Sequence, residues 1–404
     1  MTNFIEIIKY YVSFYRFKKL FIFILTLPLI FLIRLVKSIK LIQFCEIRSD
    51  RIGHFTIDSM LKIFDPNNNS NEIILYYLSD FVSNDQWKKM LKRKIKLYNF
   101  IKYLAWANKK IPGGQVHEKI INIYSSRDIN GIFHNTKDIK IPFLNEEIVS
   151  CENTLRKVGW KKGDKIFCLL VRDEEYLNKY HNNDSSSFSY HNYRNSNIQS
   201  YIEGIDCLTK RKYWVFRMGK IMTEKVNFSN KYFIDYAFCD FKSDLLDIWL
   251  FANCNGCIST GSGLDMVSLI YQKPILFLNY IPLYHWWSFA NSITLFKHLY
   301  WKESEVKLTL NEYIIHSYFK QKEYKKITIK DLSSLEIKEA IKEFIFFLDK
   351  GYHKHSKENL LLQKKFKKEI KEYAKFDLIH RNFHCNSVIG YNWLKKQGKF
   401  FFKR

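Results

Sequence analysis

A run of seven residues, Lys165–Val171 (KIFCLLV), constrains the fold of this chain more than any other segment. After its first lysine the run is apolar without alternation. A short continuous apolar run is typical of a strand that is covered on both faces, as in the middle of a parallel sheet. Parallel strands need crossover connections, which are usually helices. The run therefore predicts an α/β domain built around it.

Strand and helix patterns alternate after this run. The expected helices are Ile198–Arg211, Ser243–Asn253 with Ser243 as its N-cap, and Leu264–Tyr271. The expected strands are Tyr213–Arg217, Phe233–Ala237, Gly256–Ile258 and Pro274–Leu278. This order predicts a doubly wound sheet, in which a ligand lies beyond the carboxyl ends of the strands. Farther along, Gln363–Lys375 reads as a lysine-rich amphipathic helix, and no internal repeat is visible.

The first half of the chain predicts a second α/β domain. Leu41–Ile47 and Glu72–Leu78 are expected strands, and helical spacing runs from Gln86 to Asn108. A chain of 404 residues with 47% hydrophobic residues suggests two folded domains. We expect a membrane-associating segment over residues 1–40, an N-terminal Rossmann-like domain over 41–155 and a C-terminal Rossmann-like domain over 156–404.

The net charge favours an anionic partner. Lysine and arginine total 65 against 40 acids, which gives a formal charge of +25. The basic residues are spread over the chain, and neither zinc-finger spacing nor an RNA-binding signature accompanies them. An acidic membrane face or a phosphate-bearing substrate is therefore favoured over nucleic acid.

The eight cysteines do not form the pattern of a small disulfide-stabilised domain. Most lie inside apolar runs, where a free thiol behaves as a small core residue, as expected for Cys168. Cys254 and Cys257 form a C-x-x-C pair, which indicates either redox or zinc chemistry or two buried core residues. Since a second pair and nearby histidines are missing, the core interpretation is favoured. A reducing, cytoplasmic compartment fits this usage.

Leu20–Ile33 (LFIFILTLPLIFLI) is an uncharged segment near the N-terminus. It is shorter than the roughly 20 residues that span a bilayer, and no signal-peptidase site follows it. Basic residues flank it on both sides: Arg16, Lys18, Lys19, Arg34, Lys37 and Lys40. This pattern predicts a helix lying in, or dipping into, an anionic leaflet. The alternative is a buried helix of the folded domain.

The turn at Ser259, Thr260, Gly261, Ser262 and Gly263 follows an expected strand and begins an expected helix. Glycines permit positive φ and close backbone approach, and N–H groups at a helix start can bind phosphate. The hydroxyl groups add further donors. The alternative is an ordinary strand-to-helix turn, which is often rich in glycine.

Arg172 and Asp173 directly follow the long apolar run. An arginine at this position can form paired hydrogen bonds with a diphosphate, and the neighbouring acid can orient it. The alternative is a surface ion pair. Farther along, Arg194 within Tyr193–Asn195 is expected either to shape the same site or to end it.

A loop after the first expected strand, Arg48–His54, offers candidates for a general base. His54 can accept the proton of an acceptor hydroxyl because the ordinary pKa of histidine lies near neutrality. Asp50 is the second candidate, in case the loop turns differently. The alternative role for His54 is packing or helix capping.

Taken together, these motifs resemble a group of bacterial glycosyltransferases found with surface-polysaccharide genes. The resemblance covers about residues 45–290, with a looser match at Asn386–Leu394. The motifs that carry it are Arg51–His54, Cys168–Asp173, Tyr193–Asn195, Tyr213–Gly219, Asp240–Leu250 and Ile258–Leu264.

The resemblance implies a GT-B-like fold, with two Rossmann-like domains facing a cleft and the sugar donor bound to the C-terminal one. The residues it implies for donor binding are Arg172, Asp173, Arg194, Asp240, Ser259, Thr260, Gly261, Ser262 and Gly263. Arg172 and the hydroxyl-rich turn are similar to groups that contact the nucleotide diphosphate in fucosyltransferases. In heptosyltransferases an acid follows the Ile-Gly turn as base, whereas here His54 stands in that place.

The resulting hypothesis is an inverting, metal-independent glycosyltransferase at the cytoplasmic face of the inner membrane. It uses no cofactor, and its substrate is a nucleotide diphosphate sugar. The acceptor is a growing surface polysaccharide or lipid-linked glycan. Metal independence is expected because no D-x-D stands in a suitable loop and basic groups are plentiful. The alternative is a non-catalytic, membrane-associated scaffold of polysaccharide biosynthesis that keeps the fold.

Overall fold

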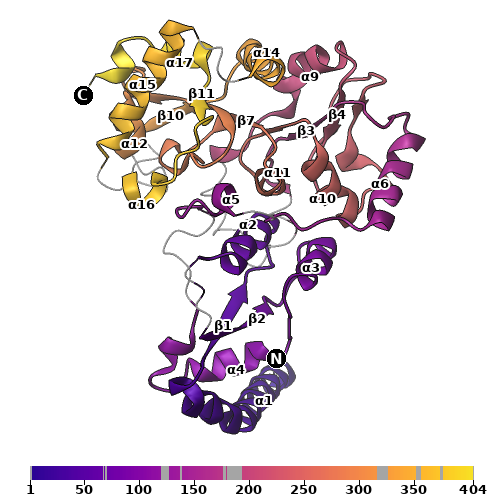
Figure 1. Ribbon diagram of the computed structural model, residues 1–404, viewed down its shortest axis with the longest axis vertical. Helices are drawn as coiled ribbons and strands as arrows, with labels where there is room; N and C mark the ends of the chain where they lie inside the picture. Colours follow the sequence, from indigo (N-terminus) through magenta and orange to yellow (C-terminus); the bar gives the residue numbers. More distant parts are fainter. Residues whose placement is uncertain are drawn as a thin grey trace. The chain divides into compact units, whose positions relative to one another are not determined.

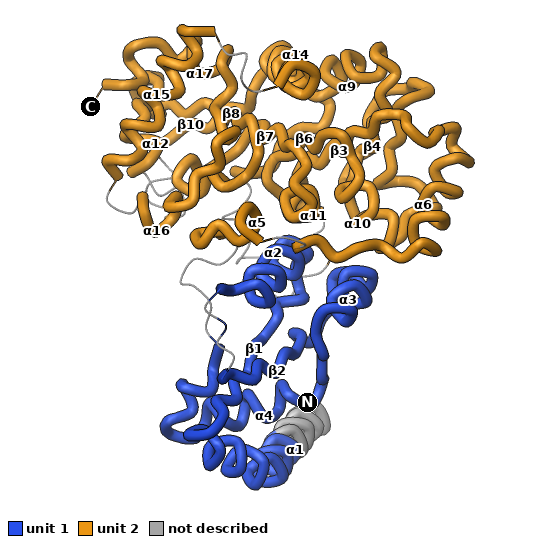
Figure 2. Tube along the Cα trace, viewed as in Figure 1, with its two compact units in different colours: residues 1–125 blue, residues 126–404 orange. Residues whose placement is uncertain are grey.

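The computed structural model divides the chain into two compact units, residues 1–125 and 126–404 (Figure 2). The structure describes residues 2–66, 68, 71–119, 127–136, 139–175, 179, 193–315, 326–351, 356–373 and 376–403, and the side chains of the first helix from Arg16 onward. The polar segment His181–Ser189, expected as a loop, lies outside the described residues.

Unit 1 is built on one parallel strand–helix–strand motif. Its elements are α1 (Thr2–Leu35), the 3-10 turn Val36–Ser38, β1 (Leu41–Ile47), α2 (Ile52–Ile63), β2 (Glu72–Leu78), α3 (Asp85–Lys92), α4 (Ile101–Asn108) and the 3-10 turn Gly114–His117. The two strands pair in parallel along their whole length, from Leu41 opposite Glu72 to Ile47 opposite Leu78. Both strands begin and end where the sequence predicts. The α/β character of this half is confirmed.

The expectation of one helical stretch from Gln86 to Asn108 is wrong. Two helices form there, α3 and α4, and α3 begins where the Asn84 side chain accepts a hydrogen bond from the Trp87 N–H group (2.8 Å). Between the helices, Leu97 makes a parallel bridge to Tyr76 of β2. The chain takes this extended conformation because the free edge of β2 offers it backbone hydrogen bonds, which helical periodicity in the sequence does not report.

Helix α1 belongs to the core of unit 1 on one side only. Ile30 and Ile33 are buried in the cluster that also contains Leu104 of α4. Phe23 meets Trp106 edge to face, with ring centroids 6.2 Å apart. By length and composition, Arg16–Ser38 could cross a membrane: its mean hydropathy is 2.4, and 17% of its most apolar window is buried.

Unit 2 contains a seven-stranded, all-parallel sheet. Its strands are β3 (Ile166–Leu170), β4 (Trp214–Arg217), β5 (Phe233–Ile234), β6 (Gly256–Ser259), β7 (Ile275–Tyr280), β8 (Ser292–Phe296) and β11 (Val388–Ile389), with β9 (His298–Trp301) and β10 (Ile327–Lys330) as a separate antiparallel pair. The order across the sheet is β11-β8-β7-β6-β3-β4-β5. The predicted doubly wound α/β architecture is therefore confirmed (Figure 1).

Helices cover both faces of this sheet. The described helices of unit 2 are α5 (Ile132–Asn135), α6 (Asn145–Lys157), α9 (Ile202–Thr209), α10 (Asp244–Asn253), α11 (Asp265–Ile270), α12 (Leu310–Ile315), α14 (Ser334–Lys350), α15 (Lys357–Lys371), α16 (Phe376–His380) and α17 (Tyr391–Gln397). Short 3-10 turns stand at Ile198–Tyr201, Tyr236–Phe238, Leu283–His285 and Phe400–Phe402. Helices α9 and α14 lie on one face, and α10 and α11 on the other (Figure 1). Apolar runs such as β3 are buried for this reason.

The winding direction of the chain reverses between β3 and β6. From β3 the chain passes to β4 and β5 on one side, and then returns to β6 and passes to β7 and β8 on the other. Because β3 and β6 are neighbours, the loops that leave their carboxyl ends diverge from one point of the sheet. This is the topological switch point, where ligands of doubly wound folds bind.

Two details of unit 2 differ from expectation. The strand expected at Phe233–Ala237 ends at Ile234, because the Asp235 carboxylate accepts a hydrogen bond from the Val226 N–H group (2.8 Å) and pairs with Arg217. Unit 2 also includes the whole of α6, which packs against α10, whereas the expected domain boundary at 155/156 falls inside this helix. Ser243 caps α10 as predicted, accepting a hydrogen bond from the Leu246 N–H group (3.1 Å).

The buried carboxyl group of Asp247, in the first turns of α10, predicts a pH dependence of stability. Burial raises its pKa from 3.8 to about 7, and a hydrogen bond with the Tyr236 hydroxyl opposes the shift. Between about pH 4 and pH 7 the folded protein therefore holds a proton that the unfolded chain has lost. Asp247 thus lowers the free energy of unfolding as the pH rises through this window.

We expect Asp247→Asn to remove that loss. Between about pH 5 and pH 8, the Asp247 carboxyl group should lower the free energy of unfolding of the wild-type protein by roughly 1–3 kcal/mol. This decrease should be missing in the variant. Urea unfolding at both pH values measures this difference. Asp206→Asn, which removes a partly exposed aspartate of unit 2 that pairs with Lys210, is the control. An unchanged pH dependence in Asp247→Asn would contradict the assignment.

Candidate functional site

The loops after β3 and β6 are joined directly at the switch point. The N–H group of Arg172 donates a hydrogen bond to the Thr260 hydroxyl (3.0 Å), and the N–H group of Thr260 donates to the Leu170 carbonyl (3.1 Å). The structure thus brings together two of the segments singled out in the sequence. Both lie at the sheet edge where an α/β ligand site is expected.

A second arginine, which stands shortly before the 3-10 turn Ile198–Tyr201, reaches the same turn. A terminal nitrogen of Arg194 donates a hydrogen bond to the Gly261 carbonyl (2.6 Å). Within the described part of the chain, the buried Nε of Arg194 has no hydrogen-bond partner. A buried donor of this kind is suited to an anionic oxygen, because an unsatisfied polar group costs free energy until it is paired.

Asn195, rather than Asp173, orients the Arg172 side chain. The Arg172 Nε donates to the Asn195 side-chain oxygen (3.3 Å), and the Ser196 N–H group donates to the Arg172 carbonyl (3.0 Å). The Asp173 carboxylate instead accepts from the N–H groups of Glu175 (3.2 Å) and Thr223 (2.9 Å). The expectation that the neighbouring acid orients the arginine is corrected: Asp173 holds the following loops.

The backbone N–H groups of the glycine turn are used within the turn itself. Asp265 accepts hydrogen bonds from the N–H groups of Ser262 (2.9 Å) and Gly263 (2.7 Å) and from the Ser259 hydroxyl (2.6 Å), and Gly261 donates to the Ser259 hydroxyl (3.0 Å). The role given to these N–H groups as a phosphate cradle is therefore corrected. A buried carboxylate already occupies the position where an anion would accept them.

This carboxylate shapes the charge of the site. Burial raises the pKa of Asp265, and the hydrogen bonds from Ser259 and from the N–H groups of Ser262 and Gly263 act in the opposite direction. Arg194 lies close enough to stabilise the ionised form. The N–H groups of Ser262 and Gly263 are therefore committed to Asp265, and the cationic groups beside the turn are Arg172 and Arg194.

Lys297 supports the Arg172 loop and was not recognised in the sequence. Its ammonium group donates to the Asn195 carbonyl (2.6 Å) and pairs with Asp331 (2.6 Å). The side chain is buried, and burial lowers the pKa of Lys297 while Asp331 raises it. Lys297 directly follows the buried strand β8. A basic residue at the carboxyl end of a buried strand was the available sequence signal.

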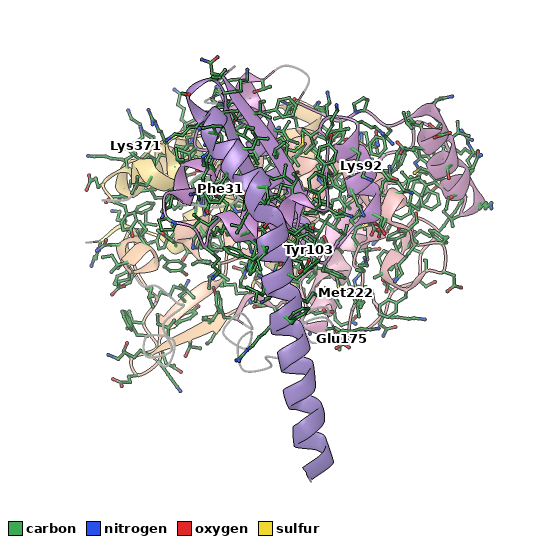
Figure 3. All side chains as sticks on the ribbon, turned by 90° about the horizontal axis from the view of Figure 1, so that it is seen from below. Phe31, Lys92, Tyr103, Glu175, Met222 and Lys371 are labelled. Atoms are coloured by element: carbon green, nitrogen blue, oxygen red, sulfur yellow. The ribbon has the colours of Figure 1, made fainter. Side chains whose placement is uncertain are left out.

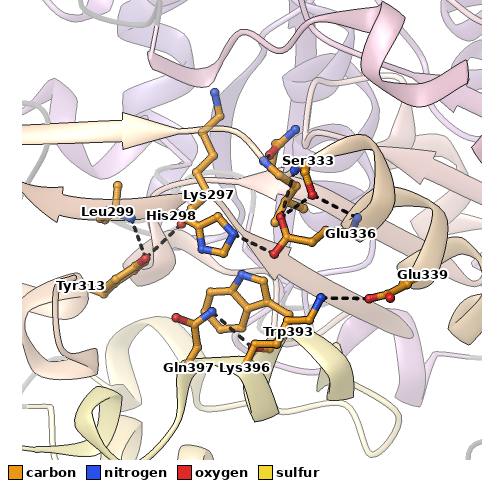
Figure 4. A network of polar contacts seen from close by, with 12 residues as sticks. Lys297, His298, Leu299, Tyr313, Ser333, Glu336, Glu339, Trp393, Lys396 and Gln397 are labelled. Carbon is orange, nitrogen blue, oxygen red and sulfur yellow. Dashed lines mark hydrogen bonds and ion pairs between the residues drawn. The ribbon is translucent and has the colours of Figure 1, made fainter. Parts of the chain in front are cut away.

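The position of Lys297 is set by the polar network in Figure 4. The Tyr313 hydroxyl donates to the Lys297 carbonyl (3.1 Å) and accepts from the Leu299 N–H group (2.9 Å). The next residue, His298, lies 3.1 Å from the Glu336 carboxylate, which also caps α14 through Ser333. These contacts hold both sides of Lys297, so its ammonium group stays directed at Asn195, the residue after Arg194.

A third arginine adds positive charge next to the turn. Arg127 is buried and donates to the Trp286 carbonyl (3.1 Å), and its other terminal nitrogen lies 3.0 Å from Nδ1 of His285. Burial, and then the charges of Arg127 and Arg194, lower the pKa of His285 to about 3, so this histidine is neutral at neutral pH. Arg127 was not predicted as a site residue, because the sequence around it shows no clear strand or helix pattern.

Asp240 is not brought to this group. It is exposed in the turn that follows the 3-10 turn Tyr236–Phe238, beyond β5. Strand β5 is the edge strand of the sheet, with β4 between it and β3. The sequence motif that begins at Asp240 leads into α10, and the structure does not place Asp240 beside Arg172, Arg194 and the glycine turn.

In unit 1, His54 lies in the first turn of α2 and pairs with a buried acid. Its Nδ1 is 2.9 Å from the Asp58 carboxylate, one helical turn along. Asp58 was missed in the sequence, although its i, i+4 spacing from His54 was the available signal. Asp50, the other candidate, lies in the loop before α2 and is 3.9 Å from the Arg51 guanidinium.

The C-x-x-C pair is part of the core, as the favoured interpretation expected. Cys254 and Cys257 are free thiols without solvent exposure, and Cys257 lies in β6 next to Cys168 of β3. Burial raises the pKa of the Cys257 thiol. Both cysteines act as small apolar residues under the switch point.

Removing the Asp265 carboxylate is expected to destabilise unit 2. Asp265→Ala leaves three donors of the glycine turn without their acceptor, and we expect the free energy of unfolding to fall by about 3 kcal/mol. Denaturant unfolding measures this change. Asp240→Ala, an exposed aspartate in the same unit, should change it by less than about 0.5 kcal/mol. Equal effects of the two substitutions would contradict the internal role of Asp265.

Two solved structures are similar to this chain. One is a glycosyl transferase family 9 protein from Veillonella parvula DSM 2008, with 13% identity over 77% of this chain and 98% of that chain and a TM-score of 0.44. The other is the ADP-heptose LPS heptosyltransferase II of E. coli, with 12% identity over 60% of this chain and 85% of that chain and a TM-score of 0.35. No protein-family model and no curated protein matches the sequence. Both neighbours are glycosyltransferases, at a similarity too distant to place the chain in a family.

Proposed function

We propose that unit 2 binds a nucleotide diphosphate sugar at the switch point and that the chain transfers the sugar to a hydroxyl group. One observation carries this proposal: the Arg194 guanidinium reaches the Gly261 carbonyl, and the Arg172 backbone N–H group binds the Thr260 hydroxyl while its side chain is held by Asn195, the residue after Arg194. Guanidinium groups match the geometry of phosphate oxygens and bind them through charge-assisted hydrogen bonds. A diphosphate between these side chains also satisfies the buried Nε of Arg194.

The same arginines suit the chemistry of transfer. In the proposed step, the acceptor oxygen forms a bond to the anomeric carbon while the bond from that carbon to the diphosphate oxygen breaks. Negative charge then develops on the departing nucleoside diphosphate, where Arg172 and Arg194 stabilise it. Because protein cations supply this stabilisation, we propose a metal-independent reaction. A single displacement of this kind inverts the anomeric configuration.

We propose that His54 accepts the proton of the acceptor hydroxyl. The Asp58 carboxylate beside Nδ1 favours the tautomer in which that nitrogen carries the hydrogen, and this tautomer gives Nε2 the basic lone pair. An acid–histidine pair of this kind also stabilises the imidazolium that forms. Asp58 is thus proposed as a positioning residue. The proposed acceptor is a growing surface polysaccharide or a lipid-linked glycan.

Donor binding tests the first part of the proposal. In a panel of nucleotide diphosphate sugars, at least one should raise the melting temperature of the protein. Arg194→Ala should weaken that affinity by at least roughly tenfold, as expected for the loss of a charge-assisted hydrogen bond. Arg211→Ala, which removes an exposed arginine of the same unit, is the control and should bind normally. A protein that binds none of the donors would instead fit the scaffold alternative.

Turnover of the identified donor tests the base. We expect His54→Ala to lower kcat by roughly 100-fold or more, and Asp58→Asn by roughly tenfold with KM nearly unchanged, because each acts on proton transfer rather than on binding. Asp50→Asn should keep nearly normal turnover. Loss of activity in Asp50→Asn together with activity in His54→Ala would assign the base to Asp50 instead. A requirement for Mg²⁺ or Mn²⁺ would contradict metal independence.

A further inference from the structure

Helix α1 carries a continuous apolar stripe that no described residue of unit 1 covers. Every large side chain on this face is at least half exposed. The stripe consists of Phe17, Leu20, Phe21, Ile24, Leu25, Leu29, Phe31, Leu32 and Leu35. These positions recur at spacings of three and four residues, which places them on one side of a helix. A contiguous apolar patch of this kind marks an interaction surface.

An aromatic residue of the neighbouring helix extends the stripe. Figure 3 looks onto α1 and shows Phe31 on the helix and Tyr103 of α4 beside it. Tyr103 is partly exposed, and the Lys102 ammonium group lies 5.1 Å from the centre of its ring. Tyrosine next to lysine is typical of the boundary between lipid tails and headgroups.

The opposite face of α1 is committed to the protein core. Ile30 is fully buried and Ile33 is 8% exposed, both in the cluster that contains Leu104. The Arg34 guanidinium fastens the end of the helix, donating to the Asn108 side-chain oxygen (2.8 Å) and to the Pro112 carbonyl (2.8 Å). A helix held in this way on a folded domain cannot be surrounded by lipid.

The part of α1 that precedes Leu20 is too polar to span a bilayer. A membrane-spanning helix needs about 20 predominantly apolar residues. The helix before Leu20 contains Glu6, Lys9, Arg16, Lys18 and Lys19. The residues after Leu20 include those packed against unit 1. Neither the part before Leu20 nor the part after it offers about 20 apolar residues that lipid could surround on all sides.

The charge around the stripe selects the kind of surface it meets. Residues 1–40 contain seven basic residues and one acid. Arg16 and Lys18 are exposed at one end of the stripe, and Lys37 is exposed at the other. Each lysine or arginine near an anionic membrane surface contributes about 1 kcal/mol of attraction. The pattern of an apolar centre with cationic ends fits an anionic bilayer leaflet.

We infer that α1 lies along the surface of an anionic bilayer without crossing it. Its exposed stripe and Tyr103 enter the boundary between headgroups and acyl chains, while Ile30, Ile33 and Arg34 stay in unit 1. This attachment is a property of unit 1 and is independent of the donor site. It commits the apolar face to lipid rather than to a second copy of the chain.

Vesicle sedimentation with the full-length protein tests the attachment. We expect binding to vesicles that contain phosphatidylglycerol, and weaker binding to pure phosphatidylcholine vesicles. Substituting Leu25 and Leu32 together with Asn should weaken binding by roughly 100-fold, or about tenfold per leucine. The matched control substitutes Leu361 and Leu378 with Asn, because Leu361 is 68% exposed and Leu25 is 66% exposed. The control should bind normally, and both variants should keep the melting temperature of the wild-type protein.

Labelling distinguishes lying on the membrane from crossing it. In a Cys239→Ser, Cys385→Ser background, which removes the two cysteines that are not buried, Arg16→Cys and Ser38→Cys should both react with a membrane-impermeant maleimide added outside the vesicles. Protection of one of these two cysteines in the bound protein would show a spanning helix and overturn the inference. Unchanged vesicle binding of the double leucine variant would also overturn it. So would a dimer in lipid-free solution that the leucine substitutions dissociate, because a second copy would then cover the stripe.

Discussion

The neighbouring positions of β3 and β6 determine the rest of the candidate site. Because the chain passes from β3 to one side of the sheet and from β6 to the other, their loops leave the same point in different directions. The hydrogen bond from the Arg172 N–H group to the Thr260 hydroxyl joins these loops. Arg194 and Lys297 then attach to this pair from outside the two strands. The parallel pairing of β3 and β6 is therefore what brings these residues close together.

The glycine turn works differently from a phosphate-binding loop that uses its backbone. Asp265 takes the N–H groups of Ser262 and Gly263, so the turn is rigid before any ligand arrives. Such a turn holds the surrounding loops in place, and the guanidinium groups beside it would supply the affinity for an anion. Preorganised cations of this kind stabilise developing charge without reorganisation during the reaction. The burial of Arg127 against a neutral His285 adds to this positive environment.

Much of the fold could be predicted from the sequence, because apolar runs and caps report local structure directly. The strands Leu41–Ile47 and Glu72–Leu78 and the cap at Ser243 are examples. The break between α3 and α4 could not be predicted, since it depends on a backbone bridge to β2. The proximity of Arg172 to the glycine turn followed from strand order. The contacts of Asp265 and Asn195 could not be predicted in this way, because side-chain hydrogen bonds depend on three-dimensional packing. The same limit applies to α1. Its composition predicts an apolar helix, but only the packing shows which of its sides is buried in unit 1 and which is exposed.

The central claim is that a nucleoside diphosphate is held by arginines at the switch point of unit 2. A crystal structure of the protein soaked with UDP, GDP, ADP or CDP tests it most directly. The account predicts phosphate oxygens within hydrogen-bond distance of the Arg172 and Arg194 side chains and of the Thr260 hydroxyl, with the Ser262 and Gly263 N–H groups still bound to Asp265. A nucleotide bound elsewhere in the chain, or phosphates held by the turn N–H groups after displacement of Asp265, would contradict it.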